Sequence, residues 1–185
     1  MENQRIRISK AMLKSGLLKL LKEKPLNQIS VCELCAAAQI NRTTFYKYYG
    51  CQTELLYEIE ADFMKQLDDD LKCIIAQSLN TLLPVLNHLY EQREIFCLLV
   101  RSIPSQEFAT HLFSLSSIGI IFQNMADESN YSETKAKYIR RFVFQGTFTV
   151  LYDWLNSENP EPVAEIADVL TFLRKKLWTA SGSFL

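Results

Sequence analysis

Apolar residues recur at intervals of three and four positions along almost the whole chain, which is the repeat of one face of an α-helix. Prolines, glycines and short polar segments separate these repeats, as is typical of turns between helices. No stretch of useful length shows the two-residue alternation of a β-strand. The pattern predicts an all-α protein with helices over residues 6–23, 31–38, 42–48, 53–77, 79–91, 92–102, 105–126, 133–156 and 161–178.

Two of the predicted helices are short and lie close together near the N-terminus. Ser30 and Glu33 form a capping-box pattern that opens the helix 31–38, because each side chain can bond the other residue's backbone amide. Gln39 and the following residue make a tight break, and Asn41 is a favourable N-cap for the helix 42–48. Such a pair of short helices has the geometry of a helix-turn-helix, whose second helix enters the major groove of DNA.

The second short helix carries two different faces. Ile40, Phe45 and Tyr49 form an apolar inner face. The outer face combines positive charge, hydroxyl groups and aromatic rings, and consists of Arg42, Thr43, Thr44, Tyr46, Lys47 and Tyr48. This mixture suits contacts to phosphates and to base edges in a major groove. An ordinary solvated helix face is the alternative interpretation.

The distribution of charge points to a polyanionic partner for the N-terminal part alone. The 185 residues carry a net charge of −1. Residues 1–50, however, hold nine Lys and Arg against three Glu, a charge of +6, which leaves −7 for the other 135 residues. A basic segment of this kind is the electrostatic signature of nucleic-acid binding. The hydrophobic share of 48% and the charged share of 22% are those of a globular protein, which excludes a disordered or fibrous chain.

Other classes of protein find less support. The first residues contain no apolar segment of a secretory signal, and the uncharged stretches 73–90 and 108–126 hold too many polar side chains for a membrane span. An odd number of cysteines, five, favours reduced thiols and a cytoplasmic location. Cys32 and Cys35 lack the two further ligands of a zinc site, so we interpret them as structural thiols. Because no nucleotide-binding, hydrolase or metalloprotease motif occurs, we predict no enzyme activity, no cofactor and no metal.

The C-terminal two thirds of the chain offer a candidate pocket and a candidate association surface. The helix 105–126 mixes aromatic and small polar side chains, as the wall of a ligand pocket does. We therefore expect a small, largely apolar effector to contact Tyr90, Phe96, Phe108, His111, Phe122 and Phe144. Apolar stripes on the last two helices permit a four-helix seam between two copies of the chain. The seam residues expected are Val143, Gly146, Val150, Trp154, Ile166, Leu170 and Leu173.

Residues 7–59 resemble the DNA-binding domain of TetR-type transcriptional regulators. The resemblance rests on residues 41–50, Asn-Arg-Thr-Thr-Phe-Tyr-Lys-Tyr-Tyr-Gly, which are similar to the family's turn and recognition helix. Apolar side chains at Val31, Leu34, Ala38 and Ile40 add to it. The resemblance implies a three-helix helix-turn-helix domain, residues 1–52, joined by a long helix to an effector-binding and dimerisation domain, residues 53–185. It also implies that the last two helices of that second domain form the dimer.

The resemblance further implies which residues touch DNA. The Tyr46 hydroxyl would contact a phosphate, and the candidate contacts together are Ser30, Val31, Asn41, Arg42, Thr43, Thr44, Tyr46, Lys47, Tyr48 and Gln52. Two positions depart from the family's pattern. Gln39 stands where the family usually has a glycine, which would relieve left-handed backbone strain. Gln52 stands where a lysine often contacts phosphate, so this contact would be neutral here.

These observations predict a dimeric regulator of transcription that binds double-stranded DNA at a near-palindromic operator. We expect a repressor that a small apolar effector releases. A helical protein-interaction module is one alternative, and a regulator that senses oxidation through Cys32 and Cys35 is another.

Overall fold

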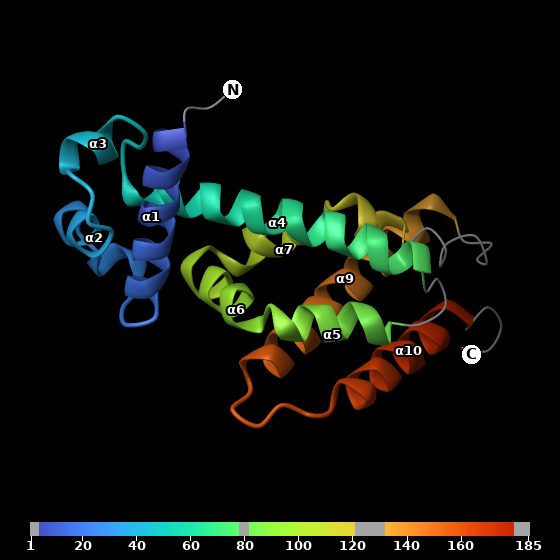
Figure 1. The fold of residues 1–185 in the computed structure, drawn as a ribbon. Coiled ribbons are helices and arrows are strands. Elements are labelled where there is room, and N and C mark those ends of the chain that lie inside the picture. The colour runs from blue at the N-terminus through green and yellow to red at the C-terminus, as the bar shows by residue number, and fades with distance from the viewer. Residues whose placement is uncertain (1–3, 78–81, 121–131, 180–185) are drawn as a thin grey trace. The chain divides into compact units, whose positions relative to one another are not determined.

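The computed structural model describes residues 4–77, 82–120 and 132–179 (Figure 1). The main helices of these ranges are α1 (Gln4–Leu21), the 3-10 turn η1 (Leu26–Gln28), α2 (Val31–Ala37), α3 (Arg42–Tyr46), α4 (Gln52–Gln77), α5 (Leu83–Glu91), α6 (Arg93–Ser102), α7 (Ser105–Phe113), α9 (Glu133–Asn156) and α10 (Val163–Thr179). These ranges contain no β-strand, so the predicted all-α fold is confirmed. Within them, no helix is both long enough and apolar enough to cross a membrane.

The chain divides into two compact units, and the division falls inside α4. One unit comprises residues 1–65 together with 98–104, and the other comprises residues 66–97 together with 105–185. The long helix α4 therefore contributes its first half to one unit and its second half to the other.

The first unit is built around the apolar faces of α1, α2 and α3, which lie side by side at the blue end of the ribbon (Figure 1). Leu17 of α1, Leu34 of α2 and Phe45 of α3 are completely buried. Gly16 allows α2 to approach α1 closely, because a Cβ at this position would lie 3.0 Å from the Cβ of Ala38. The apolar residues of these short helices thus fix the position of α3.

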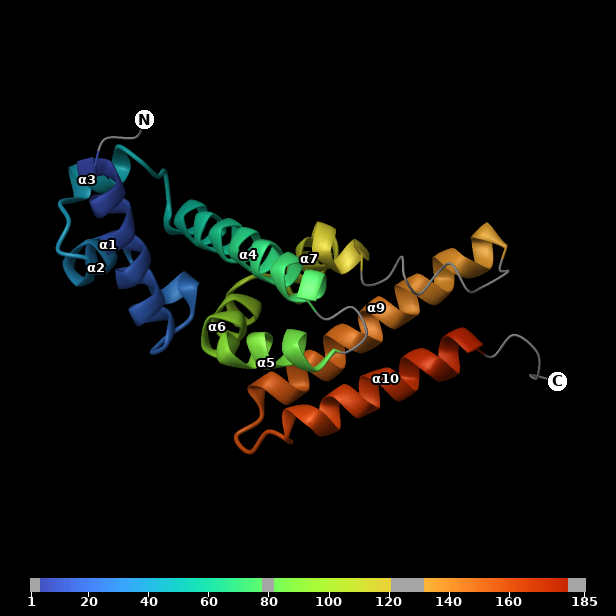
Figure 2. The ribbon, with the colours of Figure 1, turned by 45° about the vertical axis from the view of Figure 1, so that its right-hand side comes forward.

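The second unit has a core of aromatic and leucine side chains. The rings of Phe96 and Phe108 meet edge to face, with centroids 5.3 Å apart, and both side chains are completely buried. Trp154 near the end of α9 stacks on Tyr90 at 5.5 Å, and its indole Nε1 donates a hydrogen bond of 2.9 Å to the carbonyl of Glu161. Figure 2 shows α10 returning alongside α9 after the loop that contains this carbonyl.

One predicted helix is wrong. Residues 105–126 were expected to form a continuous helix, but α7 ends at Phe113, and a turn at residues 114–115 precedes further helical residues at 116–120. The remainder of that predicted helix lies outside the described residues.

Asp68 of α4 gives the physical reason for this break. Its carboxylate accepts hydrogen bonds from the Ser117 amide and from the Ser116 hydroxyl, both at 2.8 Å. A carboxylate at the start of a helix satisfies amides that have no partner inside the helix and interacts favourably with the helix dipole. A second helix can therefore begin here at little cost, and the chain turns between the two.

Candidate functional site

The two helices of the helix-turn-helix begin at the residues that the sequence indicated, whereas α2 ends at Ala37 and α3 at Tyr46, earlier than the predicted 38 and 48. The Ser30 hydroxyl accepts a hydrogen bond from the Glu33 amide at 3.2 Å and caps α2. The Asn41 side chain accepts from the Thr43 amide at 3.0 Å and caps α3. Because each cap satisfies a backbone donor that the helix leaves unbonded, the two helices start at fixed points. Both predicted N-caps are confirmed.

The turn between these helices has the backbone geometry of a Schellman motif. The Ile40 amide donates to the Cys35 carbonyl at 2.9 Å, and the Gln39 amide donates to the Ala36 carbonyl at 3.2 Å. Gln39 has a φ of 54°, and it is the one non-glycine residue with positive φ among the described residues. This position usually holds glycine, because a side chain is strained in the left-handed region. The left-handed strain expected at Gln39 is therefore present.

The outer face of α3 presents the polar side chains expected there. Phe45 and Tyr49 point into the core and are buried, whereas the Tyr46 side chain is 51% exposed. Arg42, Thr43 and Lys47 are also exposed, and Thr44 and Tyr48 are half-buried. The Arg42 guanidinium hydrogen-bonds the Tyr46 hydroxyl, which raises the pKa of Arg42 above its ordinary value. Arg42 and Tyr46 thus form one polar unit at the surface of α3.

The remaining predicted DNA contacts have different surroundings. Ser30 and Asn41 are exposed at the starts of α2 and α3, and Val31 is half-buried. The side-chain amide of Gln52 donates to the Ile29 carbonyl, so this amide joins the start of α4 to the segment before α2. Gln52 therefore has a structural partner inside the first unit.

Part of the positive charge in this unit is neutralised within the fold. The ammonium of Lys14 lies 2.7 Å from the Glu58 carboxylate, and that of Lys10 lies 3.2 Å from it. The ammonium of Lys24 is 2.6 Å from a carboxylate oxygen of Glu33. Burial alone would raise the pKa of Glu58, but the hydrogen bonds from Lys14 and Lys10 hold it below its ordinary value. The charge offered to a polyanion is thus smaller than the count of basic residues suggested.

The cysteines of α2 differ in exposure. Cys35 is buried and Cys32 is exposed, and both thiols are free. Burial raises the pKa of the Cys35 thiol, which lowers the fraction of the reactive thiolate at neutral pH.

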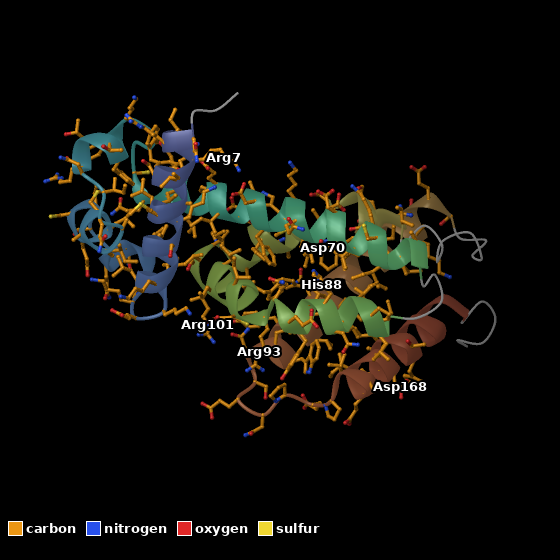
Figure 3. All side chains as sticks on the ribbon, in the orientation of Figure 1. Arg7, Asp70, His88, Arg93, Arg101 and Asp168 are labelled. Atoms are coloured by element: carbon orange, nitrogen blue, oxygen red, sulfur yellow. The ribbon has the colours of Figure 1, made fainter. Side chains whose placement is uncertain are left out.

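The second unit contains an apolar pocket of about 250 Å³. Its described walls come from α4, α5, α7, α9 and α10, and from the segment after α7. Its described lining consists of Leu67, Leu71, Leu82, Val85, Leu86, Leu89, Leu112, Phe113, Ile118, Phe142, Val143, Gly146, Thr147, Val150, Leu151, Leu170 and Leu173. His88 of α5 and Asp70 of α4, both labelled in Figure 3, have their Nε2 and Oδ2 atoms 3.2 Å apart. Neither residue belongs to the described lining of the pocket.

The expected effector contacts occupy other places. Of the six, Tyr90, Phe96, Phe108, His111 and Phe144 are absent from the described lining of this pocket, and Phe122 lies outside the described residues. Phe96 and Phe108 fill the core instead. The sequence did hold a signal for residues that line this pocket, since Leu82, Leu86 and Leu89 share one face of a helix. That stripe is indistinguishable from core packing in the sequence.

The expected seam residues are divided between core, pocket and surface. Trp154 and Ile166 are buried. Five others line the apolar pocket: Val143, Gly146, Val150, Leu170 and Leu173. Five large apolar side chains on α9 and α10 are exposed, and we refer to them together as the outer apolar face: Tyr138, Phe142, Val169, Phe172 and Leu173.

Comparison with known proteins identifies the family. A family model described as "Transcriptional regulator C-terminal region" (TetR_C_8) matches residues 76–176, which is more than half of the chain. The chain belongs to the TetR family of transcriptional regulators. The match spans α5 to α9 and most of α10, so it includes most of the pocket lining.

Relatives of known sequence or structure agree with a TetR regulator. The chain is 22% identical over 184 residues to the uncharacterized HTH-type transcriptional regulator YxbF of Bacillus subtilis (strain 168). The alignment covers 92% of this chain and 46% of YxbF, so the chain spans about half the length of that relative. A TetR transcriptional regulator from Streptococcus agalactiae 2603V shares the fold, with a TM-score of 0.70, 19% identity and coverage of 92% of this chain and 96% of that one.

Two further solved structures share the TetR fold. The dihydroxyacetone kinase operon activator DhaS has a TM-score of 0.60 at 17% identity, with 92% of this chain and 96% of DhaS covered. FadR of Thermus thermophilus, a TetR repressor solved in complex with lauroyl-CoA, has a TM-score of 0.57 at 15% identity, with 95% of this chain and 98% of FadR covered.

Proposed function

We propose that this TetR-family chain is a cytoplasmic, sequence-specific DNA-binding regulator of transcription that acts as a homodimer. The observation that carries the proposal is the outer face of α3. Two N-caps and a Schellman turn fix this helix, its aromatic residues anchor it to the core, and Arg42, Thr43, Tyr46 and Lys47 face solvent. A short, rigidly held helix with an exposed cationic and hydroxyl face suits the major groove.

Each polar group on this face has a role that follows from its chemistry. Because guanidinium donors are planar and forked, Arg42 can read the O6 and N7 atoms of a guanine or bind a phosphate in a bidentate manner. Tyr46 lies beside it and interacts with the guanidinium, so the two side chains can contact the DNA together. Lys47 and the exposed Thr43 contact the rims of the groove. The residues at the start of α2, Ser30 and Val31, contribute a backbone contact to phosphate.

A dimer is proposed because a single short reading helix gives limited specificity. Two copies related by a two-fold axis read two half-sites, about 34–36 Å apart, and hence a near-palindromic operator. The outer apolar face on α9 and α10 supplies a surface that such a contact would bury, since Phe142 and Phe172 are 66% and 58% exposed.

We further propose that an effector binds in the apolar pocket and lowers the affinity for the operator. The second half of α4 lines this pocket through Leu67 and Leu71, and its first half begins shortly after α3. One continuous helix therefore runs from the pocket wall to the DNA-reading unit. An effector shifts the balance only when it binds the two states of the protein unequally. The expected coupling is about 1–3 kcal/mol.

Selection of bound sequences from a random pool of duplexes tests the function directly. The protein should enrich one near-palindromic site and bind it with a steep dependence on salt. Arg42→Ala and Tyr46→Phe should each weaken binding to that site, and the loss of the base contact should amount to roughly 5- to 150-fold. Arg140→Ala, which removes an exposed guanidinium from α9, is the control. Binding without sequence preference, or equal affinities for all variants, would contradict the proposal and favour a protein-interaction module.

A further inference from the structure

The apolar pocket of the second unit has the size of a ligand site. It has a volume of about 250 Å³, whereas a dry cavity of about 150 Å³ in another protein suffices to bind benzene. Its lining is assembled from segments far apart in the sequence, such as Leu67 of α4, Leu86 of α5 and Leu170 of α10. The pocket is open at the side where the exposed Phe142 and Leu173 line it, so a ligand could enter from the surface.

The chemistry of the described lining disfavours a charged group inside the pocket. None of the described lining residues carries an ionisable side chain. The Asp68 carboxylate, which directly follows the lining residue Leu67 in α4, already accepts hydrogen bonds from residues 116–117 and lies 2.7 Å from the Lys72 ammonium. A carboxylate or ammonium group inside the pocket would therefore lose its hydration without gaining a partner, which is strongly unfavourable.

Thr147 adds one polar feature to this surface. It is the one described lining residue with a polar side-chain group. It lies next to Gly146, where a Cβ would meet no other atom within 4 Å, so the pocket wall leaves room beside it. Pockets of mainly apolar character commonly use one or two such groups to orient the ligand.

We propose that this pocket binds an uncharged, mainly hydrocarbon molecule, larger than a benzene ring, that carries one hydroxyl or carbonyl group directed at Thr147. The proposal takes the pocket as the effector site from the function proposed above and adds the chemical class of the effector. A free medium-chain alcohol fits this description, whereas the matching carboxylate and amine do not.

Displacement of an uncharged fluorescent dye, N-phenyl-1-naphthylamine, from the full chain tests the ligand class. Three competitors of equal length, 1-nonanol, nonanoate and nonylamine, are compared at pH 7.4. The alcohol should bind at least tenfold more tightly than either charged competitor. In the series from 1-hexanol to 1-nonanol, each added methylene should raise the affinity about fourfold until the pocket is full.

Two substitutions test the location. Thr147→Val keeps the shape of the side chain and removes its hydroxyl, so it should weaken 1-nonanol binding roughly two- to tenfold and leave dye binding unchanged. Gly146→Leu places a side chain in the open space and should weaken both ligands at least tenfold. Gly119→Leu is the matched control, because a Cβ there also meets no atom within 4 Å and Gly119 is absent from the described lining. Both changes replace a helical glycine, so each should fold at least as well as the parent chain.

The inference is overturned if nonanoate or nonylamine binds as tightly as 1-nonanol, if no alcohol displaces the dye, or if Gly146→Leu and Gly119→Leu bind the dye equally. These outcomes are independent of the DNA selection. A chain that selects a DNA site without binding alcohols refutes the ligand class alone, and a chain that binds alcohols without selecting DNA refutes the regulatory function alone.

Discussion

The strained turn of the helix-turn-helix leads to a stability prediction with an unusual sign. Replacing Gln39 by glycine should stabilise the protein, although glycine normally destabilises a helical segment. Gln39 occupies the left-handed position of the Schellman motif with a φ of 54°. Its side chain is exposed, so the substitution removes little packing. The backbone conformation therefore dominates the expected effect.

The size of the effect follows from two opposing contributions. An L-residue in the left-handed region costs roughly 1–2 kcal/mol relative to the right-handed helix, and glycine avoids this cost. Glycine also makes the unfolded chain more flexible, which costs about 0.4–1 kcal/mol. The net result for Gln39→Gly is a gain of about 1 kcal/mol in the free energy of unfolding. For a chain of this length, a gain of about 1 kcal/mol corresponds to a rise of about 2–4 °C in Tm.

Urea unfolding followed by far-UV circular dichroism measures this gain, and hydrogen exchange of the α2 amides assigns it to the first unit. Ala37→Gly is the control, since Ala37 is an exposed helical residue two positions earlier and glycine there should cost about 1 kcal/mol. The two variants share the same added flexibility of the unfolded chain. If Gln39→Gly loses as much stability as Ala37→Gly, the relief of left-handed strain does not outweigh that flexibility and the reasoning is refuted.

Two further predictions concern the second unit. Phe172→Glu places a charge on the outer apolar face and should convert the dimer to a monomer in sedimentation velocity. Thr110→Glu, on the exposed side of α7, is the control and should leave the dimer intact. If both variants sediment alike, the outer apolar face is not part of the dimer interface. Asp68→Ala should lower the free energy of unfolding by about 2 kcal/mol at pH 7, because the Ser117 amide loses its charged acceptor. Despite the opposing effect of burial, the hydrogen bonds to its carboxylate hold the pKa of Asp68 well below its ordinary value, so this contribution is complete above the ordinary pKa and is lost as the pH falls below about 4. The difference in urea midpoint between parent and variant should therefore stay constant from pH 7 to pH 5 and shrink from pH 4 to pH 3 without vanishing, with Asp69→Asn on the same helix, 60% exposed, as the control.

Features set by neighbouring residues could be predicted from the sequence. Ser30 and Asn41 cap the helices that they were expected to cap, because a cap acts on amides two or three residues away. The helix predicted over 133–156 has these bounds in the structure, since Ser132 caps its first turn and a Pro-containing polar segment follows its last. The strain at Gln39 could be predicted for the same reason. A tight turn requires a left-handed backbone at this position, and a residue with a side chain is strained in that conformation.

Features set by residues far apart in the sequence could not be predicted. The break after α7 depends on Asp68, which lies about 48 positions before the residues it bonds. The neutralisation of positive charge in the first unit depends on Glu58 of α4, which pairs with Lys10 and Lys14 of α1 across a similar separation in the sequence. Hydrophobic periodicity shows which face of a helix is apolar, but it does not show which other helix packs against that face. The sequence therefore indicated which helices form but not which side chains of different helices contact each other.

The last two helices show how this ambiguity affects the functional residues. The apolar residues of α9 are divided among the core, the pocket and the surface. Leu155 is buried in the core, Val150 lines the pocket, and Phe142 lines the pocket and is also exposed. A helix that only covers a core needs a single apolar stripe. Apolar residues outside that stripe either serve a binding surface or lower the solubility of the protein. Since Phe142 and Leu173 belong to both the pocket lining and the outer apolar face, a partner subunit on that face would lie at the rim of the pocket. Ligand affinity and dimer affinity in this chain should then be linked, and by reciprocity each must change the other by the same factor.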